Sequence, residues 1–196
     1  MNLPIAMTLV RIAAIPLICL LYFMHTPWAH FWSGVAYILV AVTDLLDGYI
    51  ARSRSQTSRF GAFLDPVADK LLVSTILVLL LSQNLTPWLW LPAAIIIGRE
   101  ITVSALREWM AEVGKRTHVA VMNLAKIKTF LLNMGMPFLL WYHADMYQVF
   151  FWRIEELPLL VLIIGLFLLT VASVLTIWTM LAYLRAAWPD LISPTP

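Results

Sequence analysis

Six apolar segments follow one another along this sequence, each about 20 residues long and therefore long enough to cross a lipid bilayer as a helix. Only 12% of the residues are charged, whereas a soluble domain carries about a quarter. Because 62% of the residues are hydrophobic, too little polar surface remains to cover a water-soluble particle. We expect an all-α fold, a polytopic membrane protein with six transmembrane helices, at residues 5–24, 31–50, 63–81, 89–109, 119–141 and 159–184.

The sequence contains no linker, internal repeat or low-complexity tract that would separate two domains. We therefore expect residues 1–196 to form a single membrane domain. The formal net charge of +2 is too small to indicate a nucleic-acid partner. Cys19 is the only cysteine, so the chain cannot form an internal disulfide.

Charged and aromatic residues predict how the helices are oriented. Basic residues collect after the second and fourth segments, at 52–59 and 115–116, whereas residues 25–30 and 82–88 contain no Lys or Arg. After the fifth segment, Arg153 stands alone among acidic residues. Since positive residues mark the cytoplasmic side, both termini should be cytoplasmic. Tryptophans, which favour the membrane interface, gather at the opposite ends: Trp28, Trp32, Trp88, Trp90, Trp141 and Trp152.

Four aspartates lie within 26 positions, at the expected cytoplasmic end of the second and third helices. Asp44 and Asp47 are three residues apart and share one helix face. Asp65 and Asp69 are four residues apart and share a face of the next helix. An antiparallel hairpin would bring both pairs together. We expect Pro66 near the start of its helix, where a missing N–H group costs nothing.

Four carboxylates in a membrane are tolerable only when cations or protons neutralise them. Oxygen ligands suit Mg²⁺, Mn²⁺ or Ca²⁺, whereas zinc would favour His or Cys. Two aspartates on each of two helices supply enough ligands for two divalent ions, which can clamp a diphosphate. Gly48, Ala51 and Gly61 leave room for a bulky ligand, and Arg52 offers a forked donor for phosphate.

Two other interpretations of the aspartates are open from the residues alone. Solvated carboxylates at helix ends are common, but four at helical spacing beside small residues are not. A cation pathway or transporter site also uses intramembrane carboxylates. The glycines and Arg52 argue against transport, because a bare cation needs neither.

Eight positions form one spaced pattern: Asp44, Asp47, Gly48, Ala51, Arg52, Gly61, Asp65 and Asp69. This pattern resembles the signature of the CDP-alcohol phosphotransferase family at every fixed position. The resemblance implies a six-helix membrane enzyme, usually a homodimer, that uses Mg²⁺ or Mn²⁺, two ions per site. It implies that all four aspartates bind metal and that Asp69 also acts as base on the incoming alcohol. It implies a CDP site made of Asp47, Gly48, Ala51, Arg52 and Gly61.

Other stretches resemble the branch of this family whose acceptor is sn-glycerol 3-phosphate. They are Asn2, Pro4, Thr8 and Arg11, the runs 59–70 and 98–109, and Lys126, Lys128 and Thr129. Ala125 and Leu132 depart from the pattern, which leaves the metal site untouched and affects only the shape of the acceptor pocket. The resemblance implies CDP-diacylglycerol as donor, membrane lipids as surroundings, and a bacterial inner membrane with the site facing the cytoplasm.

A dianionic acceptor needs cationic donors near the metals. The candidates for binding its phosphate are Arg11, Arg99, Arg107, Lys126 and Lys128, each of which could instead contact a lipid headgroup. Arg99 and Arg107, eight residues apart, can share one helix face. Serine, inositol phosphate and phosphatidylglycerol remain alternative acceptors. In the mechanism implied, Asp69 deprotonates the acceptor hydroxyl, which attacks the β-phosphorus and displaces CMP.

Overall fold

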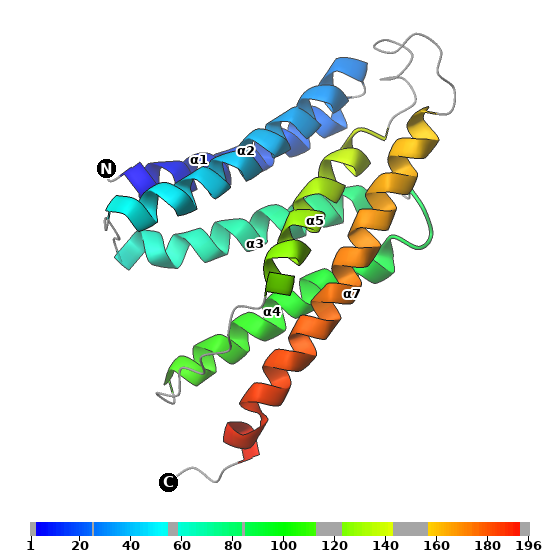
Figure 1. Ribbon diagram of the computed structural model, residues 1–196. Coiled ribbons are helices and arrows are strands. Elements are labelled where there is room, and N and C mark those ends of the chain that lie inside the picture. The colour runs from blue at the N-terminus through cyan, green and yellow to red at the C-terminus, as the bar shows by residue number, and fades with distance from the viewer. Residues whose placement is uncertain are drawn as a thin grey trace.

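A computed structural model describes residues 3–24, 26–54, 59–83, 85–112, 123–142 and 157–192. In these ranges the chain forms helices and no strand, which confirms the all-α prediction. Figure 1 shows α1 (Leu3–Phe23), α2 (Pro27–Arg54), α3 (Arg59–Ser82), α4 (Trp90–Glu112), α5 (Asn123–Leu140) and α7 (Leu157–Ile192). Each coincides with one of the expected apolar segments. Residues 115–116 and 145–153, which support the orientation prediction, lie outside the described ranges.

The helix ends differ from the prediction where a helix continues beyond its most apolar part. α2 continues to Arg54 and α7 to Ile192, several residues past the expected ends. The expected position of Pro66 near a helix start is wrong, because α3 begins at Arg59, about two turns earlier. Pro66 lies on the exposed side of α3. A proline there removes one intrahelical hydrogen bond, and the surrounding turns keep the helix continuous.

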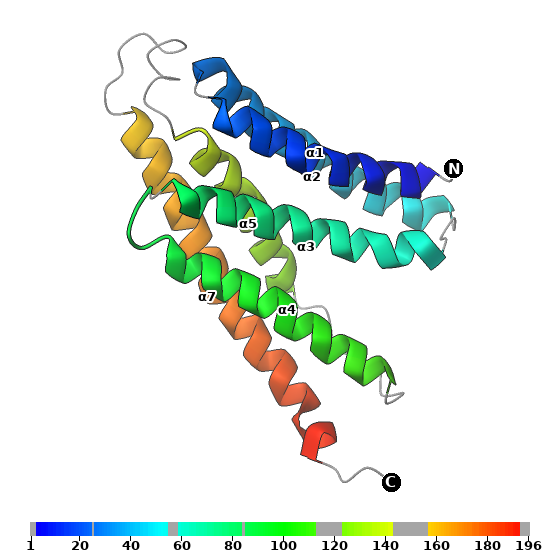
Figure 2. The same ribbon diagram turned by 180° about the vertical axis from the view of Figure 1, so that it is seen from behind.

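The helices alternate in direction and pack as neighbours. α1 contacts both α2 and α3, while α5 packs along α7 and also contacts α2 (Figure 1, and from behind in Figure 2). α4 contacts α7 and α3. Figure 1 shows the end of α2 and the start of α3 on the same side of the molecule as the start of α1. The two predicted aspartate segments therefore lie at one end of the helix assembly.

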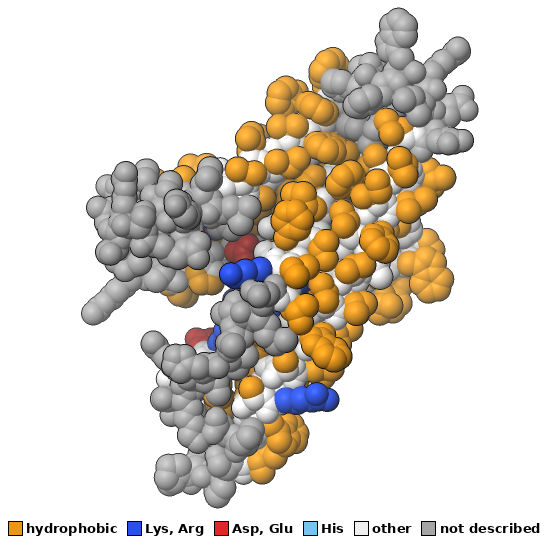
Figure 3. All heavy atoms as spheres, viewed as in Figure 1, with side chains coloured by type: hydrophobic (Ala, Val, Ile, Leu, Met, Phe, Trp, Pro, Cys, Tyr) orange, Lys and Arg blue, Asp and Glu red, His pale blue; other side chains and the backbone are white. Residues whose placement is uncertain are grey.

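Apolar side chains fill the interior and also cover much of the outside. One cluster of buried residues draws on all six described helices, with Ile18, Tyr37, Ile76, Ile96, Met136 and Leu169 among its members. Figure 3 shows a broad apolar face over α5 and α7, where Phe167 and Trp178 are largely exposed. An exposed apolar surface of this extent is unusual for a soluble protein.

By length and composition, two described stretches are apolar enough to cross a membrane as helices. They are Ala6–Phe23 in α1 and Leu157–Trp188 in α7. Trp28–Thr43 in α2 is a shorter apolar helical stretch.

Glycines allow α5 and α7 to approach each other closely. A Cβ atom on Gly165 would lie 2.8 Å from Leu139 Cδ2 and 2.9 Å from Leu139 Cγ. A Cβ atom on Gly135 would lie 3.3 Å from the carbonyl oxygen of Gly165. Small residues at a helix–helix contact permit this approach in membrane proteins, where lipid supplies no hydrophobic drive between helices. The α5–α7 contact therefore depends on glycine at these two positions.

We predict that Gly165→Val destabilises the protein by about 1–3 kcal/mol, because the added methyl groups overpack the contact with Leu139. The measurement is the thermal unfolding midpoint of purified protein in detergent. The matched control is Gly98→Ala in α4, because a Cβ atom on Gly98 would meet nothing within 4 Å. Alanine should leave stability unchanged or raise it by about 0.5–1 kcal/mol. Equal midpoints for Gly165→Val and the wild type would contradict the close contact.

Candidate functional site

The end of α2 carries the first part of the predicted site. Asp44, Asp47, Gly48, Ala51 and Arg52 lie on its last three turns. Their helical spacing puts the first four on one face. Their side chains lie outside the part of the chain that the structure describes, so their roles as metal and CDP ligands stay predictions.

The first turns of α3 carry the second part. Gly61 is buried, and Asp65 is 57% exposed. Arg11 of α1 is buried and donates from Nη1 to Asp65 Oδ1 at 3.0 Å. A residue predicted to bind the acceptor phosphate therefore contacts a predicted metal ligand, and this contact joins α1 to α3.

The described side chains include two of the four predicted metal ligands, Asp65 and Asp69. Asp65 and Asp69 lie one turn apart on α3 and are both exposed. Their carboxylate oxygens are the ligands that Mg²⁺ and Mn²⁺ favour. Among the residues that the structure describes, no group of three or more His, Cys, Asp or Glu side chains lies close enough to hold a metal ion. The predicted cluster needs Asp44 and Asp47 in addition.

A cleft between α3, α4 and α5 brings predicted residues together. Its lining consists of Asp69, Lys70, Val73, Glu100, Lys128, Thr129, Leu132 and Asn133. The predicted base Asp69 thus shares one cleft with Lys128, a predicted phosphate ligand from a helix far along the chain. Behind the lining, the buried Tyr37 of α2 donates to Asn133 Oδ1 at 3.0 Å. The hydrogen bond fixes the orientation of the Asn133 amide.

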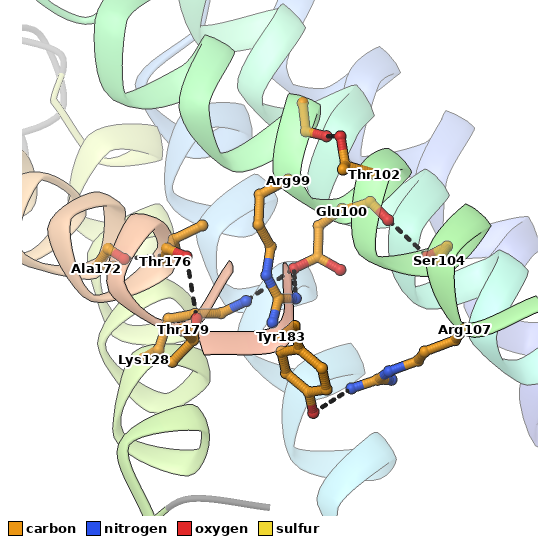
Figure 4. A network of polar contacts seen from close by, with 11 residues as sticks. Arg99, Glu100, Thr102, Ser104, Arg107, Lys128, Ala172, Thr176, Thr179 and Tyr183 are labelled. Atoms are coloured by element: carbon orange, nitrogen blue, oxygen red, sulfur yellow. Dashed lines mark hydrogen bonds and ion pairs between the residues drawn. The ribbon is translucent and has the colours of Figure 1, made fainter. Parts of the chain in front are cut away.

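Two buried cations share one carboxylate oxygen beside this cleft (Figure 4). Arg99 Nη1 donates to Glu100 Oε1 at 2.9 Å, and Lys128 Nζ donates to the same oxygen at 2.8 Å. The side chains of Arg99 and Lys128 are 7% and 5% exposed, and that of Glu100 is 21% exposed. Charges so far removed from water require a charged partner. The three groups together keep one net positive charge beside the cleft.

Tyr183 of α7 joins Arg107 to this network. Arg107 Nη2 donates to the Tyr183 hydroxyl at 2.8 Å. The guanidinium carbon of Arg107 lies 5.0 Å from the centroid of the Tyr183 ring, and that of Arg99 lies 5.9 Å from it. Both distances suit cation–π attraction. The prediction that Arg99 and Arg107 share a face of α4 is confirmed, because both contact the same ring.

Lys126 stands apart from the other candidates on its helix. It is exposed, and it precedes Lys128 by two residues on α5. Two residues correspond to about 200° around a helix, so the two lysines face different sides. Lys128 therefore lines the cleft, and Lys126 is better placed to contact solvent or lipid headgroups.

Glu100 and Tyr183 are the functional candidates that sequence reasoning missed. The sequence could have pointed to Glu100, because an ionisable residue within an apolar helix is a candidate for function by default. It could not have pointed to Tyr183, since aromatic residues are frequent near the ends of membrane helices. Its contacts join positions 76 residues apart in the sequence.

Comparison with known proteins extends the resemblance over nearly the whole chain. A family model for CDP-alcohol phosphatidyltransferase matches residues 1–188. The chain belongs to this family. Residues 1–188, which match the model of the CDP-alcohol phosphatidyltransferase family, include the aspartate segments of α2 and α3, the residues that line the cleft, and Tyr183.

Curated relatives are similar along their full length. A protein of Pectobacterium atrosepticum is 45% identical over 193 residues, 98% of each chain. One of Shigella flexneri is 44% identical over 191 residues, 97% of each chain, and one of Yersinia pestis is 43% identical over 194 residues, 99% of each chain. All three carry the name CDP-diacylglycerol–glycerol-3-phosphate 3-phosphatidyltransferase.

Proposed function

We propose that this protein transfers the phosphatidyl group of CDP-diacylglycerol to sn-glycerol 3-phosphate, with release of CMP. The observation that carries the proposal is the cleft, which Asp69 and Lys128 both line. The buried cation Arg99 shares the Glu100 oxygen with Lys128. A base and an anion receptor at one site suit an acceptor that has both a hydroxyl and a phosphate. The names of relatives 43–45% identical over almost the whole chain support the same reaction.

The donor half of the site lies where α2 ends and α3 begins. We assign Asp44, Asp47, Asp65 and Asp69 as ligands of two Mg²⁺ or Mn²⁺ ions, because their oxygens suit these cations. When bound, the ions would neutralise the charge of the diphosphate and of the departing CMP. The CDP group would contact a set in which small residues leave room for it: Asp47, Gly48, Ala51, Arg52 and Gly61.

The acceptor half lies between α4 and α5. Lys128 and Arg99 are buried cations, so their attraction for a phosphate is weakened less by water than that of exposed residues. Arg107 extends the positive region toward α7. Arg11 and Lys126 are further candidates, the first at the metal-ligand end and the second on the outer side of α5.

Side chains of the protein itself remove the proton from the acceptor hydroxyl and orient the acceptor. Asp69 accepts the proton of the primary hydroxyl, which leaves an oxygen able to attack phosphorus. Lys128 and Arg99 hold the acceptor phosphate and so turn that hydroxyl toward Asp69. The oxygen forms a bond to the β-phosphorus as the bond to CMP breaks. The phosphatidyl group passes directly to the acceptor, without a covalent bond to the enzyme.

The proposed setting is a bacterial inner membrane, with six spans, both termini in the cytoplasm, one domain and a homodimer. Alternating helix directions and the apolar outer face support six spans. Exposed Trp28, Trp32, Trp88 and Trp90 lie at the starts of α2 and α4, whereas Arg52 and Arg54 lie where α2 ends. This distribution matches an outer aromatic belt and a basic cytoplasmic side. The acyl chains of the donor would remain in the bilayer.

The direct test is CMP release by purified protein in detergent with CDP-diacylglycerol. We predict release that requires both sn-glycerol 3-phosphate and Mg²⁺, that stops in excess EDTA, and that returns when Mg²⁺ or Mn²⁺ is restored. Serine, inositol phosphate and phosphatidylglycerol serve as competing acceptors, for which we expect little release. Preference for any of these three would overturn the assigned acceptor, and full activity in EDTA would overturn the metal site.

The role of Asp69 as base predicts that Asp69→Asn lowers kcat by about 10²–10⁴-fold, the usual contribution of general-base catalysis. Because Asp69 is also a proposed metal ligand, the rate is measured over a series of Mg²⁺ concentrations. Loss that persists at saturating Mg²⁺ supports the base, whereas recovery at high Mg²⁺ indicates a ligand alone. Glu112→Gln, an exposed change on α4, is the control.

Tyr183 should support the acceptor site through Arg107 and Arg99. We predict that Tyr183→Leu raises KM for sn-glycerol 3-phosphate about tenfold, because a charged hydrogen bond and two ring contacts are lost. Tyr183→Phe keeps the ring and should raise KM for sn-glycerol 3-phosphate less. KM for CDP-diacylglycerol is measured in parallel and should stay constant. The control is Trp178→Leu, on the exposed side of α7. An equal effect on both substrates would argue against a role at the acceptor.

A further inference from the structure

We propose that Glu100 is a positioning residue that holds Arg99 and Lys128 in place as a preformed receptor for the phosphate of the acceptor. The inference rests on the proposed function and assigns a role to a residue that the catalytic steps do not require. Three observations carry it: the shared carboxylate oxygen, the surplus of unused donors, and the opening of the network into the cleft.

The shared oxygen fixes two cations from different helices. Arg99 and Glu100 are neighbours on α4, whereas Lys128 reaches Glu100 from α5, 28 residues further along the chain. Without the carboxylate, two like charges with 7% and 5% exposed side chains would face each other in a site shielded from water. Their mutual repulsion would push the two side chains apart. Glu100 therefore sets the distance between them.

Arg99 and Lys128 carry hydrogen-bond donors that Glu100 does not use, unlike a structural ion pair in which every donor has an acceptor. Among the atoms that the structure describes, the buried Nε of Arg99 has no hydrogen-bond partner. Lys128 carries three ammonium protons, of which one is directed at Glu100. Two cations against one carboxylate leave one positive charge that Glu100 does not balance, and Asp69 is the further acidic residue that lines the same cleft. A buried donor without a partner and a surplus positive charge both fit an incoming anion.

The network opens onto the side where the reaction takes place. Glu100 and Lys128 both line the cleft that contains Asp69. An anion bound by Lys128 would thus lie beside the proposed base, with the charge of Arg99 close by on the shared oxygen of Glu100. A phosphate on the acceptor is the anion that this arrangement suits, because an uncharged alcohol would not balance the positive charge that Glu100 leaves.

Removal of the Glu100 charge distinguishes two roles for this carboxylate: positioning the two cations, and competing with the phosphate for them. A positioning carboxylate keeps the cations in place, so its loss weakens phosphate binding. A carboxylate that merely occupied the place of the phosphate would compete with it, so its loss would strengthen binding. The two roles predict opposite changes in KM for sn-glycerol 3-phosphate.

The experiment compares the wild type with Glu100→Gln, Glu100→Asp and Glu108→Gln, an exposed change two turns away on α4. We expect Glu100→Gln to raise KM for sn-glycerol 3-phosphate about tenfold, the loss of one charge-assisted contact. KM for CDP-diacylglycerol should stay constant. The preference for sn-glycerol 3-phosphate over glycerol should fall by the same factor, which general damage to the fold would not produce. Glu100→Asp should be intermediate, and Glu108→Gln should equal the wild type.

Binding of inorganic phosphate by titration calorimetry, without donor, provides a readout that needs no turnover. We expect Glu100→Gln to bind phosphate about tenfold more weakly than the wild type. If the wild type fails to transfer to sn-glycerol 3-phosphate but shows this difference, the proposed function fails and the role of Glu100 stands. Unchanged or tighter binding by Glu100→Gln, or no binding by the wild type, overturns the inference. If Glu100→Gln does not fold, Glu100→Asp decides by the same measurements.

Discussion

The need to pair every buried charge governs the polar half of this molecule. Arg99 and Lys128 are buried against Glu100, and Arg11 is buried against Asp65. Lys128–Glu100 joins α5 to α4, Arg11–Asp65 joins α1 to α3, and the Arg107–Tyr183 hydrogen bond joins α4 to α7. Apolar faces of helices in lipid can pack in many ways, because lipid is as apolar as they are. Charged groups accept far fewer partners, so they select how the helices surround the cleft.

Packing of the small residues makes those polar contacts possible. Gly135 and Gly165 allow α5 and α7 to lie close together, and the same α7 carries Tyr183 to α4. At the other end of α5, Trp141 donates to the carbonyl oxygen of Phe31 at 3.1 Å, and a Cβ atom on Gly34 would overlap its indole ring. The glycines thus fix α5 between α2 and α7. Lys128 then reaches Glu100 from a helix that is held on both sides.

The sequence was sufficient for the helices and for the shared face of Arg99 and Arg107, because both follow from local periodicity. It misplaced Pro66 because apolar periodicity marks the part of a helix that contacts apolar surroundings, and α3 begins about two turns before Pro66. The partners of Glu100 and Tyr183 lie 28 and 76 residues away, and no local pattern encodes such contacts. The side-chain arrangement of Asp44 and Asp47 stays a prediction, since it lies outside the described residues.

The position of Asp69 favours one division of the proposed roles between Asp65 and Asp69, which spacing alone does not distinguish. Asp65 lies one turn before it on α3 and contacts Arg11, whereas Asp69 lines the cleft with Lys128. A residue on that turn borders both the predicted diphosphate site and the proposed cationic receptor. A proton acceptor must reach the hydroxyl of an acceptor whose phosphate is held several ångströms away. Of the two site aspartates whose side chains the structure describes, Asp69 is the one that shares the cleft with Lys128, the proposed phosphate ligand, and this supports the proposal that Asp69 is the base.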